Sequence, residues 1–276
     1  MADPLLDIKN LTIAFPSDRG PVDVVRSISF DVGREIVAVV GESGSGKSMT
    51  GRAIMGLLPR QAMVQAEAMT FEGQALQKFT PSQWNRLRGD GIGLILQDPK
   101  FSLNPAHRIG RQIEETLLLH TKLSAGERRN EALEMMAKVG LADPKRVYDS
   151  YPAALSGGMG QRVMIAAMLI NRPKLIIADE PTSALDHDLQ EQILLLLRSL
   201  AKEFGMAMLL ISHDLQQVSR YADRVVVMRR GEIVDRLPAA GLAEAQLPYT
   251  RGLWAARPSA ATYGTRLPVM DGEVAS

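Results

Sequence analysis

The chain has 276 residues, of which 46% are hydrophobic, so it is long enough to bury a sizeable core in one large domain or two small ones. Its 32 Lys and Arg residues balance 31 Asp and Glu residues, and the net charge of +1 gives no indication of a nucleic-acid partner or an anionic membrane surface. The absence of cysteine excludes disulfides, thiolate zinc sites and iron–sulfur clusters held by the chain's own thiolates.

Neither an export signal nor a membrane span is expected. Met1 to Asp7 lacks the basic and apolar stretches of a secretory signal. The longest apolar runs, such as Val163 to Ile170 and Met206 to Ile211, are far shorter than the roughly 20 residues that cross a bilayer. Any membrane process would therefore need separate subunits that cross the membrane.

The N-terminal part is predicted to form antiparallel strands. Two β-rich runs, Leu6 to Phe15 and Val24 to Val32, flank the turn-rich segment Pro16 to Pro21. The apolar, β-branched run Glu35 to Val40 then predicts a buried strand. Lys47 to Leu58 has helical spacing, which Pro59 ends.

A glycine-rich loop, Gly41 to Ser48, joins that strand to that helix. The loop with the residue after it comprises Gly41, Glu42, Ser43, Gly44, Ser45, Gly46, Lys47, Ser48 and Met49. Strand, loop and helix in this order are the context of a phosphate-binding P-loop. The glycines let backbone N–H groups converge on the phosphates, Lys47 neutralises the β and γ charges, and the Ser48 hydroxyl is offered to Mg²⁺.

The middle of the chain is predicted to be a helical insert, at approximately 98–165. Ile109 to His120 and Ala125 to Val139 both have amphipathic spacing. Strand signals return at Lys174 to Ala178 and Met206 to Ile211, separated by a leucine-rich helix from Leu189 that stops at Gly205.

Strands that alternate with helices imply a mainly parallel α/β core. The predicted fold is therefore α/β: a P-loop NTPase (RecA-like) core with an N-terminal antiparallel β subdomain and an inserted α-helical subdomain. After Arg236 the small-residue, proline-containing sequence indicates a short C-terminal appendage.

Three polar residues come directly after predicted core strands, at the edge where open α/β sheets bind ligands. Asp179 is placed to hold Mg²⁺ through water. Glu180 can accept a proton from an attacking water as a general base. His213 follows another core strand and could sense the γ-phosphate. His107, His120 and His187 lack such a placement and are interpreted as surface or loop residues.

A second anion site is predicted at Leu155-Ser156-Gly157-Gly158, before a helix expected to begin near Gln161. This motif lies at the far end of the helical insert and cannot easily serve the chain's own P-loop. A second site for the same phosphate makes most sense when another subunit supplies it.

With these motifs in this order, the chain resembles ABC transporter nucleotide-binding subunits over roughly residues 5 to 255. The resemblance implies a nucleotide-binding domain at 1–255, a tail at 256–276, and a head-to-tail dimer with two ATP molecules at its interface. Each ATP would be bound by one subunit through Gly41 to Ser48, Asp179, Glu180, Gln97 and His213, and by the other through Ser156, Gly157 and Gly158. Phe15 matches the residue that stacks on adenine, and Asp186 ends the loop Ser183 to Asp186 that crosses the interface.

Two stretches, Gln97 to Pro105 and Leu247 to Leu253, resemble the oligopeptide, dipeptide and nickel importer branch of that family. Within it, the glutamine at Gln97 is implied to touch Mg²⁺ and water and to relay nucleotide state. The implied partners are a second ABC ATPase subunit, two transmembrane permease subunits and a separate solute-binding protein. The implied location is the cytoplasmic face of the bacterial inner membrane.

The sequence departs from that branch at several points. It lacks the cysteine-rich C-terminal segment of many peptide-importer ATPases, which favours the nickel or metal-chelate members. Gly160 stands where arginine or glutamine is usual, and His187-Asp188 follows the Asp186 loop; either could alter dimer coupling.

Several alternatives stay open. A soluble ABC ATPase acting on DNA or ribosomes would carry the same motifs, although the coiled-coil heptads or second cassette usual in such proteins are not seen. A P-loop kinase or GTPase leaves Leu155 to Gln161 unexplained. The cargo, and the choice between a homodimer and a heterodimer, are not decided by the sequence.

Overall fold

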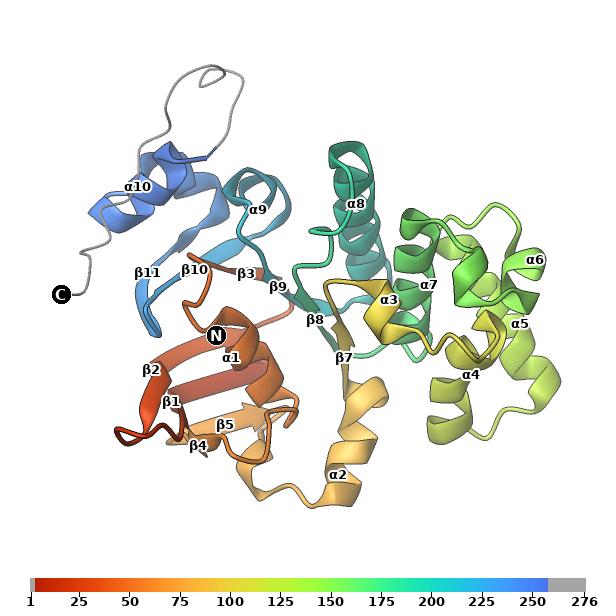
Figure 1. Ribbon diagram of the computed structural model, residues 1–276, viewed down its shortest axis with the longest axis horizontal. Helices are drawn as coiled ribbons and strands as arrows, with labels where there is room; N and C mark the ends of the chain where they lie inside the picture. The colour runs from red at the N-terminus through yellow and green to blue at the C-terminus, as the bar shows by residue number, and fades with distance from the viewer. Residues whose placement is uncertain (1–2, 258–276) are drawn as a thin grey trace. The chain divides into compact units, whose positions relative to one another are not determined.

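The computed structural model describes residues 3–257, without the side chains of Lys100 and Phe101. The chain divides into two compact units (Figure 1). Of the described residues, the first unit comprises 3–74 and 210–257, and the second comprises 75–209. Among the described residues, no helix is long and apolar enough to cross a membrane.

The first unit contains the predicted antiparallel strands, which lie side by side in Figure 1. Strand β1 pairs antiparallel with β2, β4 and β5. The strands of this sheet are β1 (Leu6–Phe15), β2 (Val22–Val32), β4 (Met63–Gln65), β5 (Ala68–Phe71) and β6 (Gln74–Ala75). Leu6, Ile8, Leu11 and Ile13 of β1 are buried, as expected of a sheet with one face on the core.

The first unit also contains the strand that leads into the glycine loop. β3 (Ile36–Val40) is buried along its whole length and pairs in parallel with β10 (Arg224–Arg229). β10 turns back into β11 (Glu232–Pro238) as an antiparallel hairpin. Helices α1 (Lys47–Ile54), α9 (Leu215–Tyr221) and α10 (Pro248–Ala255) and the 3-10 turn η4 (Ala239–Glu244) complete this unit.

The second unit holds most of the helices and two parallel strands. β7 (Ile92–Ile95) and β8 (Leu175–Asp179) pair in parallel, as predicted for the core. The remaining elements are η1 (Leu76–Lys78), α2 (Pro81–Arg86), η2 (Leu87–Gly91), α3 (Pro99–Ser102), α4 (Ile109–His120), α5 (Ala125–Lys138), α6 (Pro144–Asp149), η3 (Pro152–Ala154), α7 (Gly157–Leu169) and α8 (His187–Phe204). Helix α4 packs against α5, α6 and α7. Strand β9 (Ala207–Ile211) runs across the division between the two units.

The α/β fold class is confirmed, and the bounds of two predicted helices differ from those observed. Helix α1 stops at Ile54, before the predicted Leu58, because Gly56 adopts a left-handed conformation with φ 59°. Helix α8 begins before Leu189 because Asp186 caps it, and it ends at the predicted Gly205, whose φ is 65°.

The predicted domain limits are not tested by this division, which groups the helical segment 98–165 with β7, β8 and α8. The stretch after Arg236, expected to be a short C-terminal appendage, forms η4 and α10. Apart from residues 256 and 257, the predicted tail at 256–276 lies outside the described residues.

Candidate nucleotide site

In the first unit, the glycine loop closes around the amine of Lys47. This side chain is 6% exposed, and its Nζ donates hydrogen bonds of 2.8 Å to the carbonyl oxygens of both Gly41 and Glu42. The loop therefore encloses the amine, while Glu42, Ser43 and Gly44 are exposed. A cation surrounded by exposed main chain is the arrangement that a phosphate group requires.

The loop is walled by backbone from other strands, and this explains two of its glycines. A Cβ on Gly41 would lie 2.1 Å from the carbonyl oxygen of Met228, and one on Gly46 would lie 2.8 Å from that of Val24. Both residues have positive φ, at 150° and 100°. The far side is held by Gly231, whose N–H donates to the carbonyl of Ser45 at 3.2 Å. Side chains add to this wall at Gly46, where Cγ2 of Val25 and Cε of Met228 would lie 2.9 and 3.3 Å from an added Cβ.

The hydroxyl of Ser45 is buried and has no hydrogen-bond partner among the described residues. Such a group is unfavourable unless something else satisfies it. Gly44, next to it, has φ 79° and open space where a side chain would be. An unsatisfied donor beside an open, cationic loop fits a phosphate-bearing ligand.

Phe15 and His213, two other predicted site residues, belong to the same unit. Phe15 is the last residue of β1 and is partly exposed, as a residue that stacks on a ligand would be. His213 is exposed and follows Ser212, whose N–H donates to the carbonyl of Val39 at 3.1 Å. The backbone beside His213 therefore lies next to the end of β3, from which the glycine loop starts.

In the second unit, Asp179 and Glu180 lie at the carboxyl end of β8. Asp179 is the last residue of the strand and is 7% exposed. Glu180 has φ 48°, a left-handed conformation that is uncommon for a residue with a side chain. Its carbonyl accepts hydrogen bonds from the N–H and the hydroxyl of Ser183 at 3.3 and 3.1 Å, which stabilise the turn. The carboxylate of Glu180 is partly exposed.

Gln97 is exposed and lies between β7 and α3. Because Ile95 pairs with Ala178 in the parallel ladder, Gln97 and Glu180 both follow the same edge of the sheet. The structure thus brings the predicted glutamine and the predicted carboxylates to one edge within the second unit.

The predicted second anion site, Leu155 to Gly158, leads into a helix that begins earlier than expected. Helix α7 starts at Gly157 rather than near Gln161, because the Ser156 hydroxyl accepts a hydrogen bond from the N–H of Met159 at 3.4 Å. Gly158 is buried, and a Cβ there would lie 3.3 Å from the Cδ1 of Leu189. Ser156 and Gly157 remain exposed at the helix N-terminus, where N–H groups favour an anion.

Asp186 caps helix α8, a structural role that was not predicted from the sequence. Its Oδ1 accepts a hydrogen bond of 3.0 Å from the N–H of Leu189, which caps helix α8. Asp186 and His187 are both exposed. The cap fixes where the loop Ser183 to Asp186 ends, and this loop is the one predicted to cross a dimer interface.

Gln161 was given no role from sequence, although the structure connects it to the carboxylate segment. Its side chain is fully buried, and its Nε2 donates a 2.5 Å hydrogen bond to the carbonyl of Pro181, directly after Glu180. This hydrogen bond joins helix α7 to the turn that carries Glu180, the candidate base. This contact has a signal in the sequence: the amide of Gln161 comes shortly before the apolar run Val163 to Ile170. An amide that is buried with such a run needs a hydrogen-bond partner.

Comparison with known proteins identifies the family. The profile described as ABC transporter matches residues 25–183, more than half of the chain. The chain belongs to the ABC transporter family. The dipeptide transport ATP-binding protein DppD of Haemophilus influenzae is 43% identical over 98% of this chain and 82% of its own length. DppD of Escherichia coli is 42% identical over 98% of this chain and 83% of its own length.

Solved structures of ABC cassettes have the same fold. The cassette MJ0796, a dimer in a post-hydrolysis state bound to ADP and Pi, is 28% identical with a TM-score of 0.75, covering 85% of this chain and 98% of its own. CbiO1 from Clostridium perfringens, part of the transporter complex cbiONQ, is 25% identical with the same TM-score of 0.75, covering 88% of this chain and 92% of its own. As an ABC cassette, the chain is an ATPase.

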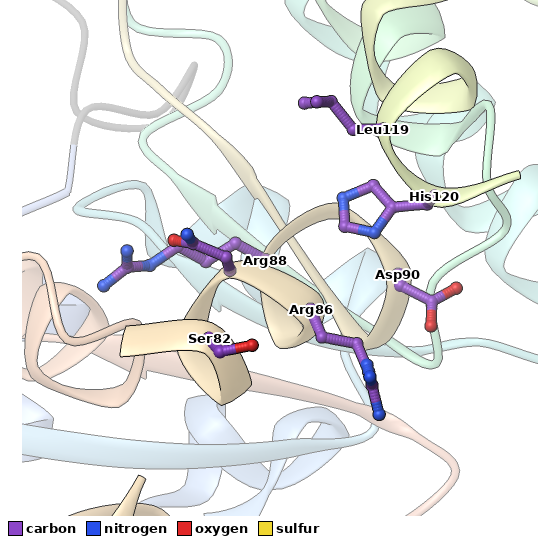
Figure 2. Close-up of a pocket in the computed structure, with 7 residues that line it drawn as sticks. Ser82, Arg86, Arg88, Asp90, Leu119 and His120 are labelled. Carbon is purple, nitrogen blue, oxygen red and sulfur yellow. The ribbon is translucent and has the colours of Figure 1, made fainter. Parts of the chain in front are cut away.

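A pocket of about 640 Å³ lies elsewhere in the second unit of this ABC ATPase (Figure 2). It is lined by Ser82, Asn85, Arg86, Arg88, Asp90, Leu119 and His120, none of which is a predicted site residue. Figure 2 shows the His120 ring, from the end of α4, directed toward η2. A Cβ on Gly89 of η2 would lie 3.2 Å from Nε2 of His120, so the two elements approach closely here.

Proposed function

We propose that this ABC ATPase powers uptake of peptides or related small solutes through separate transmembrane subunits. The observation that carries the proposal is the 43% identity to a dipeptide transport ATP-binding protein, because it extends over 98% of this chain. None of the relatives described above is named for an action on DNA or ribosomes, or for nickel.

The roles assigned to individual residues follow from their chemistry. The N–H groups of the loop Gly41 to Ser48 and the amine of Lys47 bind the phosphates of ATP. Glu180 accepts a proton from the water that attacks the γ-phosphate. His213 and Gln97 contact the γ-phosphate and that water. The exposure of both side chains, and their position after core strands, support these roles.

We propose that Mg²⁺ accompanies the nucleotide and that Ser48, Asp179 and Gln97 hold it. Hydroxyl, carboxylate and amide oxygens are the hard ligands that Mg²⁺ prefers. A bound Mg²⁺ would neutralise charge on the β- and γ-phosphates.

A dimer completes the site in this proposal. Ser156, Gly157 and Gly158 of a second ABC ATPase subunit contribute the N-terminus of α7 to the γ-phosphate, and Phe15 stacks on adenine. Asp186 lies at the interface. Ser156 and Gly157 support this arrangement because they are exposed at a helix N-terminus within their own subunit. The second subunit is either another copy or a different ATPase.

The finer organisation is also proposed. A nucleotide-binding domain at 1–255 includes the helical subdomain at approximately 98–165. Two permease subunits and a separate solute-binding protein complete the importer, with the ATPase on the cytoplasmic face of the bacterial inner membrane. The solute is chosen by those partners, and the names of the relatives favour a peptide over a nickel chelate.

The test is to trap the complex with a Glu180→Gln variant. This variant keeps the loop that binds ATP but loses the base, so we expect normal nucleotide binding with turnover reduced about 10²- to 10⁴-fold. The tagged variant is loaded with Mg-ATP in its native cell, the membranes are solubilised gently, and copurifying proteins are identified by mass spectrometry.

Two permeases in the trapped sample, depleted in a Lys47→Ala control that binds ATP more weakly, would support the importer. Ribosomes or DNA-repair factors without a membrane protein would refute it and favour the soluble alternative. Normal steady-state hydrolysis by Glu180→Gln would refute the assignment of Glu180 as the base.

A further inference from the structure

Gln161 has no role in the function proposed above, although its side chain contacts the turn that follows Glu180. It lies near the N-terminus of helix α7, is fully buried, and donates the 2.5 Å hydrogen bond from Nε2 to the carbonyl of Pro181. Its Oε1 is also buried and has no hydrogen-bond partner among the described residues. One half of the amide is therefore satisfied at Pro181, and the other half is not.

The stability of the fold does not by itself explain this buried amide. Its neighbours along α7, from Val163 to Ala167, are buried, and all of them are apolar. An amide oxygen buried without a partner is unfavourable, and an apolar residue of similar size would avoid that cost. Residues that depart from such a packing rule are expected at functional sites. The hydrogen bond to Pro181 therefore needs a functional explanation.

The turn that accepts this hydrogen bond is strained at Glu180. A residue with a side chain keeps a φ of 48° only where surrounding contacts impose that conformation. One of these contacts is local, because the N–H and the hydroxyl of Ser183 both donate to the carbonyl of Glu180. A local contact fixes the shape of the turn but moves with it. Gln161 belongs to another element, so its hydrogen bond fixes where the turn lies relative to α7.

Helix α7 is firmly held on both sides of Gln161. Gly160 is buried, and a Cβ there would lie 3.4 Å from the Cγ of Pro99 in α3, so the two elements are in close contact. Arg162 donates from Nη1 to the carbonyl of Val139, just after α5, at 2.5 Å. The amide of Gln161 is therefore presented to Pro181 from a fixed stretch of main chain.

We propose that Gln161 is a positioning residue for ATP hydrolysis, which acts through Pro181 to hold the main chain of Glu180 and so keeps its carboxylate within reach of the attacking water. The inference rests on the proposed role of Glu180 as the base. Two successive carbonyls of the turn are held, that of Glu180 by Ser183 and that of Pro181 by Gln161. A general base must stay within hydrogen-bond distance of the proton it accepts, and a displacement of about 1 Å can lower the rate about 10²-fold.

The test compares Gln161→Met with Val163→Ala in the purified full-length protein. Methionine has the length of glutamine but cannot donate a hydrogen bond to Pro181. Val163 is a fully buried residue of the same helix, so Val163→Ala creates a packing defect and leaves that hydrogen bond in place. The rate constant of single-turnover hydrolysis, the dissociation constant for Mg-ATP and the melting temperature are measured for each protein. Gln161→Asn, whose amide is one methylene shorter, provides the result if Gln161→Met does not fold.

We expect Gln161→Met to lower the hydrolysis rate constant about 10- to 100-fold, because the base is displaced. The dissociation constant should change much less than the rate, since the glycine loop is intact. Gln161→Asn should lower the rate in the same way. Val163→Ala should hydrolyse ATP at the wild-type rate even though its melting temperature falls.

A double-mutant cycle separates positioning from a general structural effect. If Gln161 acts through Glu180, Gln161→Met should lower the rate no further in a Glu180→Gln background. A further loss in that background overturns the inference, as does a wild-type rate in Gln161→Met or Gln161→Asn, or an equal fall in rate in Val163→Ala. Normal hydrolysis by the single Glu180→Gln variant would instead refute the proposed base itself, which keeps the two failures distinguishable.

Discussion

Replacing Gly41 with alanine should destabilise the protein by an amount that the loop geometry allows us to estimate. The added Cβ would lie 2.1 Å from the carbonyl oxygen of Met228, whereas ordinary C···O contacts are about 3.3 Å or longer. Met228 cannot retreat easily, because β10 is paired with β3 on one side and β11 on the other. Crowding of this kind costs about 1–3 kcal/mol.

The backbone adds a second penalty. Gly41 has φ 150°, a value that residues with side chains rarely adopt, and such strain costs about 1–3 kcal/mol. The sum, roughly 2–6 kcal/mol, is a large share of the 5–15 kcal/mol that stabilises a typical domain. Gly44 provides a matched control: its φ is 79°, but nothing lies within 4 Å of an added Cβ, so Gly44→Ala should carry the strain alone.

The assay is thermal unfolding of the nucleotide-free protein. With about 2–4 °C lost per kcal/mol for a chain of this size, Gly41→Ala should melt roughly 2–12 °C below Gly44→Ala. Equal melting temperatures for the two variants would contradict the crowding argument. A Gly41→Ala protein as stable as the wild type would contradict both the crowding argument and the backbone-strain argument.

Three further results are expected. Lys47→Ala should raise the dissociation constant for ATP about 10- to 150-fold, the loss of a charged hydrogen bond, measured by titration with a fluorescent nucleotide; an unchanged constant would contradict it. Burial and a hydrogen bond to Glu114 raise the pKa of Tyr148 to about 12, so the neutral hydroxyl stabilises the fold below pH ~10 and this contribution is lost as the pH rises toward 12. An ultraviolet titration should show a tyrosine that ionises near pH 12 and that Tyr148→Phe removes. Asp186→Ala should lower the stability by about 1 kcal/mol through loss of the α8 cap, with a smaller effect in Asp188→Ala, and equal melting of the two would refute the cap.

The sequence predicted well those features that depend on local periodicity. Helix α4 has the predicted bounds, Ile109 to His120, because its apolar residues recur at helical spacing. The ends of α1 and α7 were wrong because single residues decide them: Gly56 stops one helix and Ser156 starts the other. Helix α10 was not predicted, because the stretch after Arg236 was interpreted only as a small-residue, proline-containing appendage; Pro248 in fact stands at the start of this helix.

In the candidate site, too, some features could be predicted from the sequence and others could not. The loop around Lys47 could be predicted because its residues are contiguous in the sequence and each has a chemical reason to be there. The contacts that shape it could not, because Val24 and Met228 reach the loop through backbone atoms whose position depends on strand pairing. The hydrogen bond from Gln161 to Pro181 likewise joins segments that only tertiary packing brings together.

The backbone walls of the glycine loop also bear on how freely this sequence can vary. The atoms nearest to an added Cβ on Gly41 and Gly46 are main-chain oxygens of Met228 and Val24, and replacing the side chains of those two residues leaves these oxygens in place, although Cε of Met228 also lies 3.3 Å from the Cβ on Gly46. The two sides of each contact should therefore tolerate substitution to different degrees. Positions 24 and 228 can change among apolar residues, whereas any side chain at position 41 or 46 is crowded by main chain, so the two partners in one contact evolve under different constraints.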